Sequence, residues 1–321
     1  MAPAVHRSVP TVPMKIGVVL PIAQDDAASP VPSYAEIRAI ATSAEDRGLD
    51  SIWVYDHLLF RFDGETTGIH ECWTILAAVA EATSRVQLGT IVMCIGFRNA
   101  ALLAKMAATL DHLSGGRLIL GLGSGWHDPE FDAFGYPTDH KVGRFEEALT
   151  IIGSLIRDGR VDLDGRWMTA RDAVLVPPAR PDLPILVAAK RPRMLELTAR
   201  HADAWNLAWF GAPDERWAGA RRNLDAACAT VGRDPATLER TVGVNVRYPD
   251  LLPARATTAD DGPGQEPALV GDEAIVAGLA AYADEGTSHV IAALEPTTPE
   301  TVTRFAEAAR TFRAGVGAAT G

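Results

Sequence analysis

The chain has 321 residues, of which 47% are hydrophobic and 22% are charged, so it can bury a large core and lacks the composition of a disordered protein. Its net charge of -11 at pH 7 has the wrong sign for binding nucleic acid or an anionic membrane surface. No apolar stretch reaches the roughly 18 residues that a membrane-spanning helix needs. These features predict a cytoplasmic globular protein.

Residues 1–13 lack the apolar core of a secretory signal and are predicted to be a flexible leader, followed by one domain over residues 14–321. From there on, short apolar runs alternate with longer amphipathic segments. The predicted strands are Lys15–Leu20, Ser51–Tyr55, Val86–Met93, Leu118–Leu122, Ile185–Ala188, Ala204–Asn206, Arg240–Val246 and His289–Leu294. The predicted helices are Ser33–Arg47, Cys72–Thr83, Asn99–Leu113, Arg144–Arg157, Pro192–Ala202, Asp214–Thr230, Asp272–Asp284 and Pro299–Arg313.

Apolar strands separated by helices indicate a parallel sheet that is covered by those helices. Eight such units predict an α/β protein with a single (β/α)8 TIM barrel. An open, doubly wound sheet gives the same local pattern and remains the alternative.

Long connections follow the second, fourth and seventh predicted strands, at Asp56–Glu71, Gly123–Gly143 and Pro249–Gln265. Each leaves a strand at its carboxyl end, where barrel enzymes place their active sites. Overlapping the third, Ala254–Pro267 is either a mobile lid or a poorly ordered insertion. The Asp-Gly pair within Val161–Trp167 predicts a separate small hairpin.

Asp56 and His57 form the strongest local candidate for chemistry, because they come directly after the second predicted strand. A histidine can donate or accept a proton near neutral pH, and the neighbouring carboxylate can orient it or bind the edge of a cofactor. A histidine that only stabilises the loop is the structural alternative.

The sequence Gly121-Leu-Gly-Ser-Gly-Trp126 ends the fourth predicted strand, and its glycines permit close approach of a ligand. It does not match the dinucleotide-binding fingerprint, so a Rossmann site is disfavoured. Trp126 and His127 open the loop that follows. They line a pocket or plug the space beneath the loop.

A local positive cluster follows the fifth predicted strand, where Lys190, Arg191 and Arg193 adjoin Ala188 and Ala189 at a predicted helix start. Small residues, a helix N-terminus and cationic side chains together favour binding of an anionic group. A solvated surface cluster is the alternative.

The three cysteines, Cys72, Cys94 and Cys228, are odd in number and lack C-x-x-C spacing, so they are predicted to be reduced, buried thiols. An apolar setting would keep Cys94 protonated and inert. No metal-binding motif or nucleophile elbow occurs, so the sequence predicts no metal site.

Together these segments resemble the luciferase-like monooxygenase family, which comprises flavin- and deazaflavin-dependent oxidoreductases on a (β/α)8 barrel. The resemblance covers nearly the whole chain, from Lys15 to Phe312. Its most specific part runs from Phe97 to LDHLSGGR at Leu110–Arg117. The other segments that show the resemblance are KIGVVLP, AEDRG followed by SIWVYDH, TSRVQLGT, GLGSGW, FGYP and HADAWN.

The resemblance implies roles for residues that match the family's motifs. Asp56 and His57 match the site beside the flavin's reactive centre, with His57 as the catalytic proton donor or acceptor. Cys94 and Ile95 match a bulge in the third strand that in relatives often holds a non-prolyl cis peptide against the ring. Gly123 and Ser124 would lie near the ring or its side chain, and Ala188–Arg193 matches the phosphate cradle, here with alanines in place of the usual glycines.

In its general character the sequence most resembles the actinobacterial branch of the family, which uses the deazaflavin F420. The acidic tail of F420 suits the positive cluster. This resemblance implies hydride transfer between F420 and a small organic substrate. Trp126 replaces the glutamate of the sugar-phosphate dehydrogenase branch, which argues against a phosphosugar. The alternatives are an FMN-dependent monooxygenase that uses oxygen, a non-catalytic flavin-binding protein, and a cofactor-free hydrolase. The resemblance also implies a homodimer and a diffusible reductase that supplies reduced cofactor.

Overall fold

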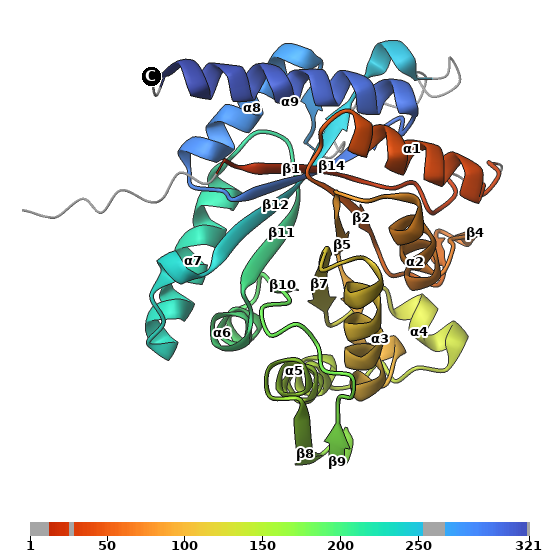
Figure 1. The fold of residues 1–321 in the computed structure, drawn as a ribbon, viewed down its shortest axis with the longest axis vertical. Coiled ribbons are helices and arrows are strands. Elements are labelled where there is room, and N and C mark those ends of the chain that lie inside the picture. The colour runs from red at the N-terminus through yellow and green to blue at the C-terminus, as the bar shows by residue number, and fades with distance from the viewer. Residues whose placement is uncertain (1–12, 26–28, 253–266, 320–321) are drawn as a thin grey trace, which may run out of the picture.

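Parallel strands form a closed barrel in the computed structural model of the protein, which describes residues 13–25, 29–252 and 267–319 (Figure 1). The barrel strands are β1 (Lys15–Val19), β2 (Ser51–Val54), β5 (Gln87–Thr90), β7 (Leu118–Gly123), β10 (Ile185–Ala188), β11 (Ala204–Phe210), β12 (Glu239–Arg247) and β14 (His289–Glu295). Each pairs with the next in this order, and β14 pairs with β1. The predicted (β/α)8 barrel is therefore confirmed, and the open sheet is wrong because the ring closes.

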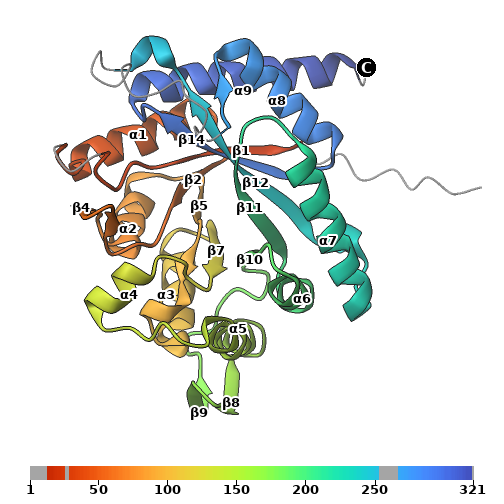
Figure 2. The same ribbon diagram turned by 180° about the vertical axis from the view of Figure 1, so that it is seen from behind.

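Helices surround this barrel in both views (Figures 1 and 2). They are α1 (Tyr34–Asp46), α2 (Cys72–Ala82), α3 (Ala100–Leu113), α5 (Lys141–Asp158), α6 (Pro192–His201), α7 (Glu215–Val231), α8 (Asp272–Asp284) and α9 (Pro299–Ala319). Several begin at the expected caps, since Ser33 forms a capping box with Glu36 and Asn99 caps α3. Among the described residues, no helix is long and apolar enough to cross a membrane.

The connections at the carboxyl ends of the barrel strands carry small elements of their own. The hairpin of β3 (Phe60–Phe62) and β4 (Glu65–Thr67) lies between β2 and α2, and α4 (Asp128–Phe134) lies between β7 and α5. After β12 come η3 (Pro249–Leu251) and β13 (Leu269–Val270). Residues 1–12 of the predicted leader and residues 254–266 of the predicted lid or insertion lie outside the described residues.

The predicted hairpin after α5 is present and longer than expected. It consists of β8 (Arg160–Asp164) and β9 (Thr169–Val174), with the predicted Asp-Gly pair at its turn. Its turn is held against α5 because the Glu147 carboxylate accepts hydrogen bonds from the backbone N–H groups of Trp167 and Met168. The hairpin projects outward beyond α5 (Figure 2).

The third barrel strand is interrupted, and the predicted position of its bulge at Cys94–Ile95 is wrong. Pairing of β5 with β7 stops, and it resumes at β6 (Met93–Cys94), which pairs with the end of β7. The bulge between them contains the non-prolyl cis peptide Ile91–Val92. Cys94 thus lies in a paired strand, and Ile95 begins the short helix η1 (Ile95–Phe97). The bulge precedes Cys94 because the extra residue lies between two pairings with β7, Gly89 with Ile119 and Met93 with Leu122.

The barrel interior is filled by side chains from all around the ring. Its apolar members are Val19, Trp53, Ile91, Ile119, Leu186, Ala204 and Ile291. Trp53 is fully buried, and a Cβ at Gly89 would meet its ring at 2.1 Å, so a glycine is required opposite the indole. A rigid interior of this kind fixes the strand ends that carry the loops.

A buried polar network lies in the same interior. Ser51 Oγ accepts a hydrogen bond from Trp53 Nε1 at 2.8 Å and lies 2.7 Å from Nε2 of His289. Burial, with the nearby charge of Lys15, lowers the pKa of His289 to about 3. The His289 ring is therefore neutral in the folded protein at neutral pH.

We expect this histidine to make the protein sensitive to acid. The unfolded chain binds a proton at His289 below about pH 6.5, whereas the folded chain does not until about pH 3. The free energy of unfolding should therefore fall as the pH drops through this window, by up to about 1.4 kcal/mol per pH unit from this group. Urea titrations at several pH values measure this dependence. The free energy of unfolding should change less steeply with pH in His289→Gln than in the wild type, whereas the exposed-site control His112→Gln should match the wild type. Equal slopes for all three proteins would contradict this assignment.

Candidate active site

Asp56 is a buried carboxylate at the carboxyl end of β2, with 3% of its surface exposed. Its Oδ2 accepts hydrogen bonds from the Cys94 backbone N–H at 2.9 Å and from Arg98 Nη1 at 2.5 Å. Its Oδ1 accepts from Arg98 Nη2 at 3.1 Å and from the Cys72 thiol at 3.3 Å. Asp56 therefore ties the end of β2 to β6 and to the Arg98 side chain.

Charge around Asp56 is compensated within this cluster. Burial raises the pKa of Asp56, and the Arg98 guanidinium opposes that rise. Burial by itself would lower the pKa of Arg98, but Asp56 holds it well above its usual value. Asp56, Glu71 and Cys72 lie close enough together to hold a metal ion, but Arg98 bridges the two carboxylates. The described cluster is thus an ion-pair network.

His57 faces a second carboxylate that comes from the other side of the loop cluster. Its Nδ1 lies 2.8 Å from Oε1 of Glu130 on α4, and Oε2 of Glu130 accepts the Leu58 N–H at 2.8 Å. Glu130 is 1% exposed. A carboxylate that accepts Nδ1–H fixes both the ring orientation and the tautomer, so Nε2 is the nitrogen left for proton transfer.

Aromatic rings flank the His57 imidazole. Phe60 lies 4.5 Å away and Trp126 5.5 Å away, measured between ring centroids. His127 is buried, and its Nε2 accepts the Arg61 N–H at 3.0 Å. Burial lowers the pKa of His127, which favours the neutral acceptor that this hydrogen bond needs. His127 therefore supports the β3–β4 hairpin, whereas Trp126 is exposed.

The predicted residues of the third and fourth strands lie against each other. Cys94 pairs with Gly123 across β6 and β7, and burial raises the pKa of its thiol to about 12, which favours the protonated thiol. A Cβ at Gly123 would meet the Val92 side chain at 2.4 Å. All three cysteines are buried and free, as predicted. Ser124 follows Gly123 and is half-buried.

The predicted phosphate cradle follows β10, which pairs with β7 in the barrel. Lys190 and Arg191 are exposed and have no ion pair among the residues that the structure describes, whereas Arg193 pairs with Glu146 at 2.5 Å. The backbone of Ala189 is already used, since its N–H donates to Asn206 and its carbonyl accepts from Trp205 Nε1. Lys190 and Arg191 are therefore the cations of this predicted cradle that have no ion pair within the described ranges.

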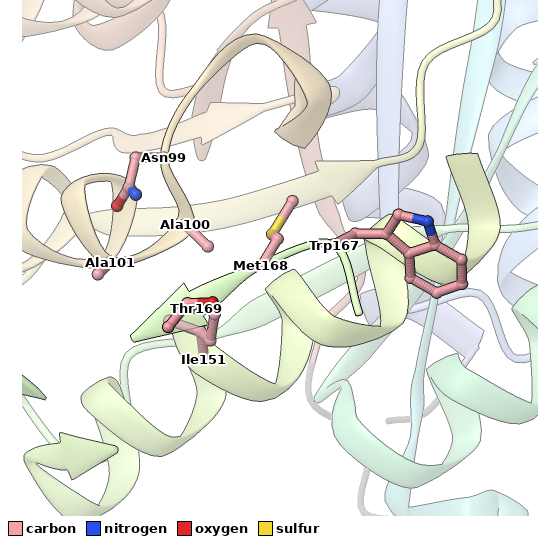
Figure 3. Close-up of a pocket in the computed structure, with 7 residues that line it drawn as sticks. All are labelled: Asn99, Ala100, Ala101, Ile151, Trp167, Met168 and Thr169. Atoms are coloured by element: carbon pink, nitrogen blue, oxygen red, sulfur yellow. The ribbon is translucent and has the colours of Figure 1, made fainter. Parts of the chain in front are cut away.

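A cavity of about 180 Å³ lies away from these residues, between the start of α3, the helix α5 and the turn of the β8–β9 hairpin (Figure 3). Ala100, Ile151, Trp167 and Met168 contribute to its lining. None of the predicted site residues lines it.

Two residues of the site escaped the sequence analysis. Arg98 neutralises Asp56 from 42 positions away, and Glu130 reaches His57 from 73 positions away. The helix α4 that carries Glu130 could have been found, because Asp128-Pro129-Glu130 is a helix-start signal and Gly135 is a helix-end signal.

The chain belongs to the luciferase-like monooxygenase family, whose model matches residues 14–251. It is 35% identical, over a 222-residue alignment, to a phthiodiolone/phenolphthiodiolone dimycocerosates ketoreductase of Mycobacterium sp. (strain JLS). That match covers 63% of this chain and 58% of that protein. It is 36% identical, over a 172-residue alignment, to an F420-dependent glucose-6-phosphate dehydrogenase of Amycolatopsis mediterranei (strain U-32). That match covers 51% of this chain and 50% of that protein.

The fold matches a solved F420-dependent secondary alcohol dehydrogenase in complex with an F420–acetone adduct. The TM-score is 0.72 at 18% identity, and the match covers 92% of this chain and 98% of the other. The chain spans about three-fifths of the length of the ketoreductase.

We expect loss of the Asp56 carboxylate to destabilise the protein strongly. Asp56→Ala leaves the Arg98 guanidinium partly buried without its main partner, which typically costs about 3–5 kcal/mol. The control Asp164→Ala removes one member of an exposed pair with Arg171 and should change the free energy of unfolding little. Guanidinium titrations measure both. Similar small losses in the two variants would show that Asp56 does not organise this end of the barrel.

Proposed function

We propose that the protein is an oxidoreductase that uses the deazaflavin F420 and transfers hydride between it and a small organic substrate. The observation that carries this proposal is the His57–Glu130 hydrogen bond at the carboxyl end of the barrel. A histidine oriented by a buried carboxylate is the arrangement that a proton-transfer catalyst needs. Membership of the luciferase-like family, which includes the F420-dependent relative, supports the redox part.

His57 is assigned the proton step. Glu130 holds Nδ1, so Nε2 is the reacting nitrogen. The imidazolium gives its Nε2 proton to a substrate oxygen during reduction, and the neutral ring takes a proton at Nε2 during oxidation. Asp56 is a positioning residue, because its oxygens are engaged by Arg98, Cys94 and Cys72. F420, when bound, supplies or accepts the hydride at carbon.

The residues of the chain fit an anionic cofactor. Lys190 and Arg191 are exposed at the start of α6, where a helix N-terminus favours negative charge. Ala188, Gly123 and Ser124 are the small residues assigned to its close approach. We assign the phosphate and the acidic tail of F420 to Lys190 and Arg191. Arg193 can bind the cofactor with them only if its ion pair with Glu146 breaks.

An FMN-dependent monooxygenase is the second candidate, and the description of the matching family as luciferase-like monooxygenases favours it. It would take reduced FMN from a separate reductase and activate oxygen. The homodimer, the reductase partner and the cytoplasmic location remain predictions.

A cofactor titration separates these two candidates. We expect the purified protein to bind oxidised F420 more tightly than FMN or FAD. Lys190 and Arg191 have no ion pair among the described residues, and their charge suits the acidic tail of F420. Lys190→Ala combined with Arg191→Ala should weaken F420 binding, and the matched control Lys105→Ala should not. Changes in cofactor fluorescence measure the affinity. Binding of FMN alone would reverse the choice of cofactor.

Removal of the imidazole tests the proton step. We expect His57→Ala to keep its affinity for F420 but to lose about 10²- to 10⁴-fold in kcat, since general acid–base catalysis contributes that much. The exposed-site control His112→Ala should turn over like the wild type. Steady-state kinetics with a substrate found by screening measures this effect, and wild-type turnover by His57→Ala would remove His57 from the mechanism.

A further inference from the structure

Three aromatic side chains form a continuous stack whose two ends both lie against His57. Phe60 and Phe62 of β3 stack at 6.2 Å with an interplanar angle of 18°, and Phe62 and Trp126 stack at 6.3 Å with an angle of 22°. We call Phe60, Phe62 and Trp126 the aromatic stack. Both of its ends contact the His57 imidazole, because Phe60 and Trp126 each flank that ring.

The hairpin of β3 and β4 presents these rings through ordinary strand alternation. Phe60 and Phe62 lie on one face, and Arg61 between them points to the other, where its Nε donates to Thr66 Oγ1 at 3.1 Å. The buried His127 ring lies 4.8 Å from Phe62 and holds the hairpin through the Arg61 N–H. The buried His127 side chain therefore holds the aromatic stack in place.

The outer part of the stack is exposed although it is apolar. Trp126 is 64% exposed and Phe62 is 54% exposed. Single exposed apolar residues are common, but adjacent exposed rings beside a candidate catalytic group are typical of a binding surface. Flat rings in parallel order suit an alkyl chain or an aromatic group laid across them.

We propose that the aromatic stack binds the apolar body of the substrate, so that the substrate is a ketone or secondary alcohol with a long alkyl or aryl group. This inference rests on the proposed function and adds the substrate class. The contacts of Phe60 and Trp126 with the His57 ring point to this occupant, since a carbonyl that is bound at His57 lies next to these rings. Hydride passes from the reduced deazaflavin to the carbonyl carbon, the C=O π pair moves to oxygen, and that oxygen takes the Nε2 proton of the His57 imidazolium, which is left as the neutral ring with its Nδ1–H on Glu130. The ketone is reduced to the alcohol and the deazaflavin is oxidised.

The test uses acetone, hexan-2-one and decan-2-one as probes of chain length. With reduced F420, the wild type should show a kcat/KM that rises about two- to fourfold for each methylene that contacts the stack, mainly through a lower KM. Phe62→Ala and Trp126→Ala should each reduce the ratio of kcat/KM for decan-2-one to kcat/KM for acetone by about tenfold or more. Phe134 is 53% exposed and makes no ring contact among the described residues, so Phe134→Ala is the matched control and should keep the gain.

Equilibrium binding separates this inference from the proposed function. Calorimetry with decan-2-one and the protein loaded with oxidised F420 requires no turnover. Stack-dependent binding without reduction of any ketone would support the stack and overturn the proposed function. Turnover with equal chain-length dependence in Phe62→Ala and the wild type would overturn the stack alone. A dimer weakened by Phe62→Ala in sedimentation, with chain-length dependence unchanged, would show that a second copy covers the rings and would also overturn it.

Discussion

The hydrogen bond between His57 and Glu130 is the interaction on which this account depends. It joins residues 73 positions apart, and closure of the barrel makes it possible by bringing the carboxyl ends of β2 and β7 to one rim. Glu130 is nearly inaccessible to water and also accepts the Leu58 N–H, so the loop and the ring are fixed together. A histidine held in this way needs little reorganisation before it transfers a proton.

Two adjacent residues at the end of β2 have different tasks. Asp56 points into the protein, where Arg98 and the backbone of Cys94 use both of its oxygens. His57 lies against the aromatic stack, and Glu130 engages Nδ1 and leaves Nε2 uncontacted by its carboxylate. Across β7, the cations at Lys190 and Arg191 provide positive charge in a chain whose net charge is -11. The rim therefore combines an oriented histidine, an apolar surface and two exposed cations.

The sequence predicted the barrel because most strands are apolar runs and most helices have an amphipathic period, features that local residues encode. Helix ends were less certain. α5 begins at Lys141 rather than Arg144, because His140 takes a left-handed conformation before it without a side-chain cap. The bulge was misplaced by three residues, from Cys94 to Ile91, since the pairings with β7 set its position. Glu130 and Arg98 could not be assigned as partners, because only the closed fold brings them to His57 and Asp56.

The most direct test of the central claim is a crystal structure of the protein with oxidised F420 bound. The account predicts that the deazaflavin ring lies at the carboxyl end of the barrel beside Nε2 of His57, with Glu130 still on Nδ1 and the phosphate at Lys190 and Arg191. A ring bound elsewhere, or a His57 imidazole turned away from it with the Glu130 contact broken, would contradict the account.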